Sequence, residues 1–185
     1  MDTRSEQTAG FAAEAAARLT RTPGFVAATA GPGVTNLLTP ITSAFFNGAP
    51  LVAIGGRSPD FRWGLGALQE LDQPPLFTSV TKSAVTAHDC EQVGNLTEAA
   101  FATAMSPHQG PTFLDIPMDK LFTPAPILTE PLASITKPQS DLTQLDLAID
   151  MIGAAQRPVI IAGGDIWQNQ ANFNYGRLWR RSVFP

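Results

Sequence analysis

Short apolar runs alternate with longer alanine-rich or amphipathic stretches along the first 120 residues of the chain. The apolar runs are bounded by glycine and proline, and runs of this kind predict buried strands. Strands are predicted at Phe25–Thr29, Leu51–Ile54, Ala84–Thr86 and Thr112–Ile116, the last closed by Pro117. Helices are predicted at Gly10–Leu19, Val34–Phe46, Gln73–Val80 and Asp89–Met105. This alternation indicates an α/β fold, in which a parallel sheet carries helices on both faces.

The residues before the first helix fit a capping box. Thr3 would be the N-cap residue and Glu6 the third helical residue, where a carboxylate also suits the positive end of the helix dipole. Further along the same helix, Glu14 and Arg18 have the i,i+4 spacing of an ion pair. By this interpretation Glu6 is an ordinary residue of a helix start.

Ligands of such sheets bind beyond the carboxyl ends of the strands. This rule selects the segments Ala30–Asn36, Gly55–Asp72 and Pro117–Lys120. In the first, Gly31-Pro32-Gly33 would bring backbone amides to a helix start, where an anion or a polar ring binds. A plain strand-to-helix turn fits the same residues, and the spacing is not that of the dinucleotide motif. In the second, Glu70 is expected to be solvated or paired rather than catalytic.

Composition and charge exclude several classes of function. Of the 185 residues, 44% are hydrophobic and 15% are charged, which is typical of a soluble globular protein. The net charge of −4, with basic residues clustered only at the C-terminus, argues against nucleic-acid binding. No apolar run reaches the ~18 residues that span a bilayer, and the first residues do not form a secretory signal. We therefore expect a cytoplasmic protein without membrane contact, and the single Cys90 excludes a disulfide or a cysteine-based metal site within the chain.

The composition changes after residue 120. Residues 121–140 are rich in proline, threonine and serine and predict a linker. A helix at Leu142–Ala155 and a strand at Pro158–Ala162 then indicate the start of a second α/β domain, which would be incomplete at residue 185. Residues 174–181 show no amphipathic continuation, and a frameshifted or truncated reading frame is our hypothesis for this stretch.

Several motifs together resemble thiamine-diphosphate-dependent enzymes of the acetolactate synthase type. The segment Arg4–Glu14 resembles the family's R-H-E-Q…A-x-x-A, and Thr29–Asn36 resembles its turn T-S-G-P-G-x-x-N. Gly66–Asp72 is similar to the loop A-F-Q-E-x-D, and Gly110–Pro117 is similar to the strand G-P-x-x-x-D-I-P. Order and spacing agree across residues 3–120, and residues 140 to about 172 are similar to the start of the family's central domain.

The resemblance implies a pyrimidine-binding domain, a central domain and a diphosphate-binding domain in one long chain. Residues 1–120 would be the pyrimidine-binding domain without its first strand and helix, and residues 141–185 the start of the central domain. The implied cofactor is thiamine diphosphate, bound at the turn formed by Gly31, Pro32, Gly33 and Asn36. Mg would be held through the C-terminal domain, because no metal ligands and no G-D-G…N motif occur in this chain. Many acetolactate synthases also bind FAD through the central domain, and the sequence leaves FAD binding open.

In the family, a glutamate of R-H-E-Q hydrogen-bonds the aminopyrimidine ring of the cofactor, and by position this residue is Glu6. The implied reaction decarboxylates a 2-oxo acid such as pyruvate and joins the remainder to a second carbonyl, in branched-chain amino-acid biosynthesis. To share a proton with the ring, the carboxyl group needs a raised pKa, and an apolar setting raises it. We expect the alanines after Glu6 to provide that setting, so Glu6 would be a helix-start residue and a catalytic group at once.

The departures from the family's pattern concern the substrate side. Leu68, Gln69 and Met118 are expected to lie in the active-site loops, yet Leu68 replaces a phenylalanine and Met118 replaces the lysine of acetolactate synthases. Ser5 replaces the histidine before the glutamate. Oxalyl-CoA decarboxylases and 2-hydroxyacyl-CoA lyases share R-H-E-Q and are the alternative enzymes. A non-catalytic remnant and a generic nucleotide-binding domain are the alternatives from other classes.

The family also builds its active site between two subunits. We therefore expect a homodimer or tetramer for the full-length enzyme, with a small 2-oxo acid as its substrate. The chain of 185 residues is predicted to be inactive alone and to bind the cofactor weakly.

Overall fold

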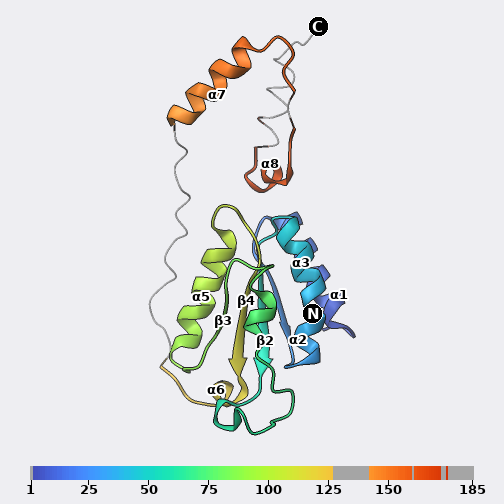
Figure 1. Cartoon of the computed structure of the whole chain (residues 1–185), viewed down its shortest axis with the longest axis vertical. Coiled ribbons are helices and arrows are strands. Elements are labelled where there is room, and N and C mark those ends of the chain that lie inside the picture. Colours follow the sequence, from blue (N-terminus) through green and yellow to red (C-terminus); the bar gives the residue numbers. More distant parts are fainter. Residues whose placement is uncertain (1, 127–141, 160, 172–173, 175–185) are drawn as a thin grey trace. The chain divides into compact units, whose positions relative to one another are not determined.

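The computed structural model describes residues 2–126, 142–159, 161–171 and 174 (Figure 1). The chain divides into two compact units, Met1–Ile135 and Thr136–Pro185. The first unit holds the sheet and all of the candidate site residues. The described helices of the second unit are α7 (Leu142–Ala154) and α8 (Gly164–Gln168).

The sheet of the first unit is parallel and has four strands in the order β1-β2-β4-β3. Its strands are β1 (Gly24–Ala28), β2 (Leu51–Arg57), β3 (Ala84–Thr86) and β4 (Thr112–Pro117). The register places Ala28, Gly55, Asp115 and Thr86 in one row across the sheet. The carboxyl ends of all four strands therefore meet at one edge, as the alternation of the sequence predicts.

Helices cover both faces of this sheet (Figure 1). One face carries α1 (Glu6–Thr20), α2 (Pro32–Asn36), α3 (Leu38–Phe46) and α4 (Pro74–Phe77). The other face carries α5 (Gln92–Met105). At the carboxyl edge lie the short helices η1 (Asp60–Arg62) and α6 (Met118–Leu121). The predicted α/β fold class is confirmed.

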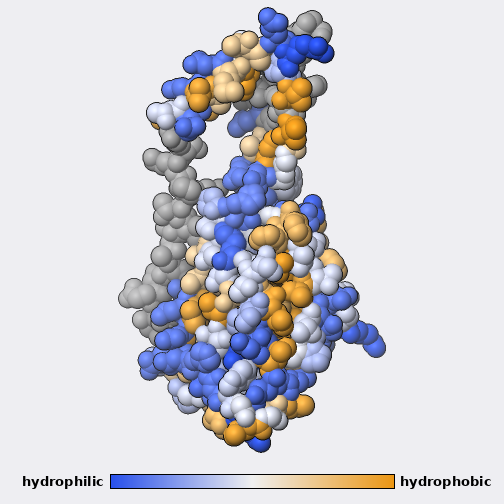
Figure 2. All heavy atoms as spheres, in the orientation of Figure 1, coloured by the Kyte–Doolittle hydropathy of each residue, from blue (hydrophilic) through white to orange (hydrophobic). Residues whose placement is uncertain are grey.

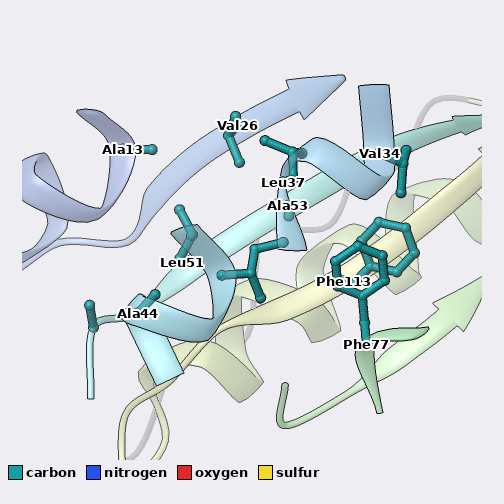
Figure 3. Close-up of a cluster of buried hydrophobic side chains, with 11 residues drawn as sticks. Ala13, Val26, Val34, Leu37, Ala44, Leu51, Ala53, Phe77 and Phe113 are labelled. Carbon is teal, nitrogen blue, oxygen red and sulfur yellow. The ribbon is translucent and has the colours of Figure 1, made fainter. Parts of the chain in front are cut away.

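Alternate residues of the central strands point into two hydrophobic cores. Leu51, Ala53 and Phe113 face the side of α1 to α4, where the rings of Phe77 and Phe113 stack with centroids 4.1 Å apart (Figure 3). Val52 and Leu114 face α5. Since both faces of these strands are buried, the stretches Leu51–Ile54 and Phe113–Leu114 are continuously apolar, which explains why the strands can be found from the sequence.

The predicted helix Val34–Phe46 is interrupted, because α2 ends at Asn36 and α3 begins at Leu38. Pro40 explains the break. It has no backbone N–H to donate, and the restart places it in the first turn of α3, where an N–H has no partner within the helix.

The predicted capping box is wrong. Ser5, not Thr3, is the N-cap residue, and its extended backbone makes Glu6 the first residue of α1. The hydroxyl of Thr3 donates to the carbonyl of Ser5 at 2.9 Å, and Ser5 makes no side-chain capping hydrogen bond. The predicted pair of Glu14 and Arg18 is present, with 4.0 Å between Oε1 and Nη1.

Several predicted boundaries differ from the observed ones. β2 continues through Gly55 and Gly56 to Arg57, and β4 includes Pro117. The helix predicted at Gln73–Val80 is limited to Pro74–Phe77, and α5 begins at Gln92 because Asp89 forms a turn with the amide of Glu91.

In the second unit, α7 confirms the helix predicted at Leu142–Ala155. The strand predicted at Pro158–Ala162 is wrong for the residues of that range that the structure describes, since none of them is paired in a sheet. Most of the predicted linker and the stretch 175–181 lie outside the described residues. Among those that are described, no helix is long and apolar enough to cross a membrane.

Candidate functional site

A cavity of about 600 Å³ opens at the carboxyl edge of the sheet. It is lined by the end of β1, by β2 and the loop that follows it, and by the end of β4 with α6. All three segments that the strand-end rule selects contribute to the lining, through Ala30, the stretch Gly55–Gln69 and Met118.

The three residues predicted for the substrate side, Leu68, Gln69 and Met118, all line this cavity. The side chain of Leu68 is 86% exposed and that of Met118 is 48% exposed. Figure 2 shows hydrophobic surface at the same end of the first unit, near the β2–α4 loop and α6. The cavity rim therefore presents two large apolar side chains, while Arg62 and Gln69 add polar groups to the lining.

The loop between β2 and α4 has an internal clamp. The carboxylate of Glu70 accepts hydrogen bonds from the backbone amides of Gly64 at 2.9 Å and Ala67 at 3.1 Å. Glu70 is thus paired, as expected from the sequence, and its charge holds the loop that carries Leu68 and Gln69. Gln69, directly before Glu70, has a φ of 59°, which is a left-handed conformation.

Glu6 lies outside the cavity lining, beside the turn that follows β1. Its Oε2 accepts a hydrogen bond from Asn36 Nδ2 at 3.1 Å, which joins the start of α1 to the end of α2. Two of the predicted site residues are therefore in direct contact, although 30 positions separate them in the sequence.

The expected rise in the pKa of Glu6 is contradicted. A hydrogen bond from its own backbone amide and the bond from Asn36 lower the pKa of Glu6 below its usual value of 4.5, against a smaller opposing effect of burial. The alanines do not shield the carboxylate, because Ala9 and Ala13 pack into the core beneath α1. Glu6 is consequently ionised at neutral pH.

Gly31 begins the turn with a φ of 62°, a left-handed conformation that favours glycine. Its N–H donates to Oε1 of Gln73 at 2.9 Å. The amide of Gly31 is therefore bonded inside the protein and is not a free donor for a ligand. A Cβ at this position would lie 2.9 Å from Cβ of Gln69, so the loop packs directly on the turn.

Gly33 is also required by close packing. A Cβ there would lie 2.7 Å from Cγ2 of Thr29 and 3.6 Å from Oε1 of Glu6. The absence of a side chain lets α2 approach the end of β1 and leaves the space beside the carboxylate open. Pro32, between the two glycines, is the first residue of α2, a position that its fixed φ favours.

A buried polar network lies beneath the turn, and sequence reasoning missed it. Arg57 Nη1 donates to Asp115 Oδ2 at 3.2 Å, to Thr86 Oγ1 at 3.3 Å and to Asp72 Oδ1 at 3.5 Å. Gln73 Nε2 donates to the same Asp115 oxygen at 3.2 Å. One signal was available: a carboxylate inside an apolar strand needs a cationic partner, and Arg57 ends the neighbouring strand.

A second charged group lies at the same edge of the sheet. The carboxylate of Asp60 contacts His88 Nδ1 at 2.9 Å and Lys120 Nζ at 3.7 Å, and Lys120 also pairs with Asp119 at 2.9 Å. These contacts join η1 to α6. Among the residues that the structure describes, no group of three His, Cys, Asp or Glu side chains is arranged to hold a metal ion.

Known proteins match the chain over its sequence and its fold. A family model described as "Thiamine pyrophosphate enzyme, N-terminal TPP binding domain" matches residues 1–76. The chain is 44% identical to the acetolactate synthase large subunit IlvG of Mycobacterium tuberculosis over 191 aligned residues, which cover all of this chain and 34% of that protein. It is 41% identical to 2-hydroxyacyl-CoA lyase 2 of Danio rerio over 122 residues, 66% of this chain and 20% of that protein.

A solved structure agrees with the fold. Benzoylformate decarboxylase from Polynucleobacter necessarius superposes with a TM-score of 0.78 at 24% identity, over 90% of this chain and 32% of that one. The fold and the sequence together define the class: this chain belongs to the thiamine-diphosphate-dependent enzyme family. Within that family it is acetolactate synthase-like. It spans about one third of the length of the two mycobacterial acetolactate synthases that it matches.

Proposed function

We propose that this chain supplies the pyrimidine-binding side of a thiamine-diphosphate-dependent enzyme that performs the acetolactate synthase reaction. The observation that carries the proposal is the exposed Glu6 carboxylate, held by Asn36 at the rim of the glycine turn. In this proposal Glu6 is the catalytic residue, and Gly31, Pro32, Gly33 and Asn36 form the cofactor-binding turn.

The residues at this turn fit the pyrimidine ring of thiamine diphosphate. Gly33 adds no side chain of its own beside Oε1 of Glu6, and Asn36 donates to Oε2. A flat ring with a polar nitrogen can therefore approach Oε1. When bound there, thiamine diphosphate would supply a carbon nucleophile and an electron sink for decarboxylation of the 2-oxo acid.

The contribution of Glu6 is to hold a proton between its carboxylate and the ring nitrogen. In the chain as described, Asn36 and the backbone favour the charged form of Glu6. Covering the carboxylate with a ring and with further protein would remove water from it and raise its pKa, because desolvation disfavours the charge. Once covered, Glu6 would share a proton with the ring nitrogen, whereas in the uncovered state it loses that proton to water.

The substrate would enter through the apolar cavity beside this turn. Leu68, Gln69 and Met118 line it and would contact the substrate. We assign a small 2-oxo acid such as pyruvate as the first substrate. The 2-hydroxyacyl-CoA lyase reaction is the second candidate. The match to that enzyme favours it, and so does Met118 in the cavity lining, which is uncharged where acetolactate synthases have a lysine.

We further infer that residues 1–120 form the pyrimidine-binding domain, 121–140 a linker and 141–185 the start of a central domain. The large apolar side chains of α7 are about half exposed or more, which supports the view that further structure covers them in the working enzyme. Mg and the diphosphate would be held by a separate domain, and the enzyme would act as a cytoplasmic homodimer or tetramer. Whether the central domain also binds FAD stays open.

The product profile of the full-length protein tests this proposal. With pyruvate, Mg and thiamine diphosphate we expect CO2 release and formation of acetolactate. Cleavage of a 2-hydroxyacyl-CoA without acetolactate formation would favour the second candidate. Turnover of neither substrate, in protein that remains folded, would favour a non-catalytic remnant.

A further inference from the structure

We infer that Gln73 is the positioning residue of the cofactor turn, and this inference rests on the cofactor site proposed above. The side chain of Gln73 is completely buried. It lies at the end of the β2–α4 loop, directly before α4, and the motifs of the sequence give it no role.

The primary amide of Gln73 bridges separate parts of the carboxyl edge. Oε1 accepts the N–H of Gly31 at 2.9 Å, while Nε2 donates to the carbonyl of Gly56 at 2.9 Å and to Asp115 Oδ2 at 3.2 Å. One side chain therefore connects the turn after β1 with β2 and β4. A buried amide with all these bonds formed is a rigid link, because losing any of them leaves a polar group unpaired.

The orientation of this amide is fixed by charge. Asp115 is completely buried, and Arg57 Nη1, at 3.2 Å, is its ionic partner. An amide turned the other way would place its oxygen against Asp115 Oδ2 and the carbonyl of Gly56, where only acceptors face it. The Arg57–Asp115 pair thus aims Oε1 of Gln73 at Gly31, and the left-handed φ of Gly31 presents the N–H to it.

The consequence reaches Glu6 through the short helix α2. Gly31 precedes α2, Gly33 lies beside Oε1 of Glu6, and Asn36 at the end of α2 holds Oε2. A turn released from Gln73 would let α2 shift relative to α1. The predicted result is weaker binding of thiamine diphosphate, even though Gln73 is buried below the surface that the cofactor would touch.

Gln73→Met is the direct test, because methionine keeps the length and volume of the side chain and removes all of its hydrogen bonds. We expect the Kd of the full-length enzyme for thiamine diphosphate, with Mg present, to rise about tenfold, the usual scale for a buried group left unpaired. Thr112→Val is the matched control. Thr112 is also completely buried and bonds the carbonyl of Ala100 at 3.2 Å, but it lies at the opposite end of β4. Its loss should lower Tm and leave the Kd within twofold.

Gln73→Glu gives a second test, because general destabilisation would not produce the pH dependence of Kd that we expect for this variant. The introduced carboxyl group can still accept from Gly31, but its second oxygen can donate to Gly56 or Asp115 only when protonated. The ratio of its Kd to the wild-type Kd should therefore fall as the pH decreases from about 8 to about 6, whereas the ratio for Gln73→Met should stay flat.

These variants also separate the inference from the proposed function. If Gln73→Met binds thiamine diphosphate as the wild type does, or if Thr112→Val weakens binding equally, the positioning role is wrong while the cofactor site stands. If the wild-type enzyme itself does not bind thiamine diphosphate, the proposed function is wrong and this inference with it.

Discussion

Asn36 Nδ2 donates a hydrogen bond to Glu6 Oε2 at 3.1 Å and fixes one oxygen of the carboxylate at the start of α1. The two residues come from separate motifs of the family resemblance, so their contact joins those motifs into one site. The bond also contributes to lowering the pKa of Glu6. It leaves the other oxygen beside Gly33, which carries no side chain.

Asn36→Ala should raise the pKa of Glu6 toward its ordinary value, because a donor to the charged form is removed. A carboxyl resonance followed by NMR as a function of pH measures this directly. Since folding lowers this pKa, the interaction stabilises the protein above the ordinary pKa of glutamate and is lost as the pH falls through the lower, folded value. An unchanged titration midpoint in Asn36→Ala would contradict the role given to Asn36.

Gly33→Ala should destabilise the first unit by about 1–3 kcal/mol, the usual cost of overpacking, because its Cβ would lie 2.7 Å from Cγ2 of Thr29. Chemical denaturation measures the change. Gly153→Ala in α7 is the control, since no atom lies within 4 Å of the added Cβ and alanine favours a helix. Equal stability of Gly33→Ala and wild type would show that α2 can move away from β1 at no cost.

Glu70→Ala should loosen the loop of the cavity, because the amides of Gly64 and Ala67 lose their acceptor. We expect trypsin to cleave after Arg62 several times faster in this variant, as local opening exposes the backbone. Glu91→Ala, an exposed glutamate just before α5, should not alter the rate. Cleavage at the wild-type rate in Glu70→Ala would mean that the clamp does not hold the loop.

Lys82→Met should lower the stability of the first unit by about 1–3 kcal/mol, without an effect at the carboxyl edge of the sheet. Lys82 Nζ donates to the carbonyls of Thr103 at 2.6 Å and Ser106 at 2.7 Å, and so satisfies the C-terminal end of α5. Thermal denaturation of the variant tests this contribution, and an unchanged Tm would argue against it.

The sequence predicts the sheet well and the polar interior poorly, for a physical reason. Apolar strands bounded by glycine and proline produce a local pattern, so β1 to β4 can be found without a structure. The network of Arg57, Gln73 and Asp115 depends on a register between strands that no local pattern encodes. The break before Pro40 and the N-cap position of Ser5 were also mispredicted, although Pro40, which explains the break, is visible in the sequence.

Part of the candidate site can also be predicted from the sequence, and part cannot. Motif spacing brought Glu6, Asn36 and the glycine turn together, and these residues do meet. The expected rise in the pKa of Glu6 is wrong, because Ala9 and Ala13 pack into the core and do not surround the carboxylate. Which way these alanines face is set by tertiary packing.

The central claim is that Glu6 activates the cofactor, and Glu6→Gln tests it most directly. In the full-length enzyme, at saturating Mg, thiamine diphosphate and pyruvate, we expect kcat to fall by about 100-fold or more, the scale of a lost acid–base group. Glu14→Gln is the matched control in the same helix. Glu14 is buried and accepts from Ser43 and Asn47, so this change should lower stability and leave kcat within about twofold, as no contact with the site is lost. A Glu6→Gln enzyme with the wild-type kcat would contradict the account.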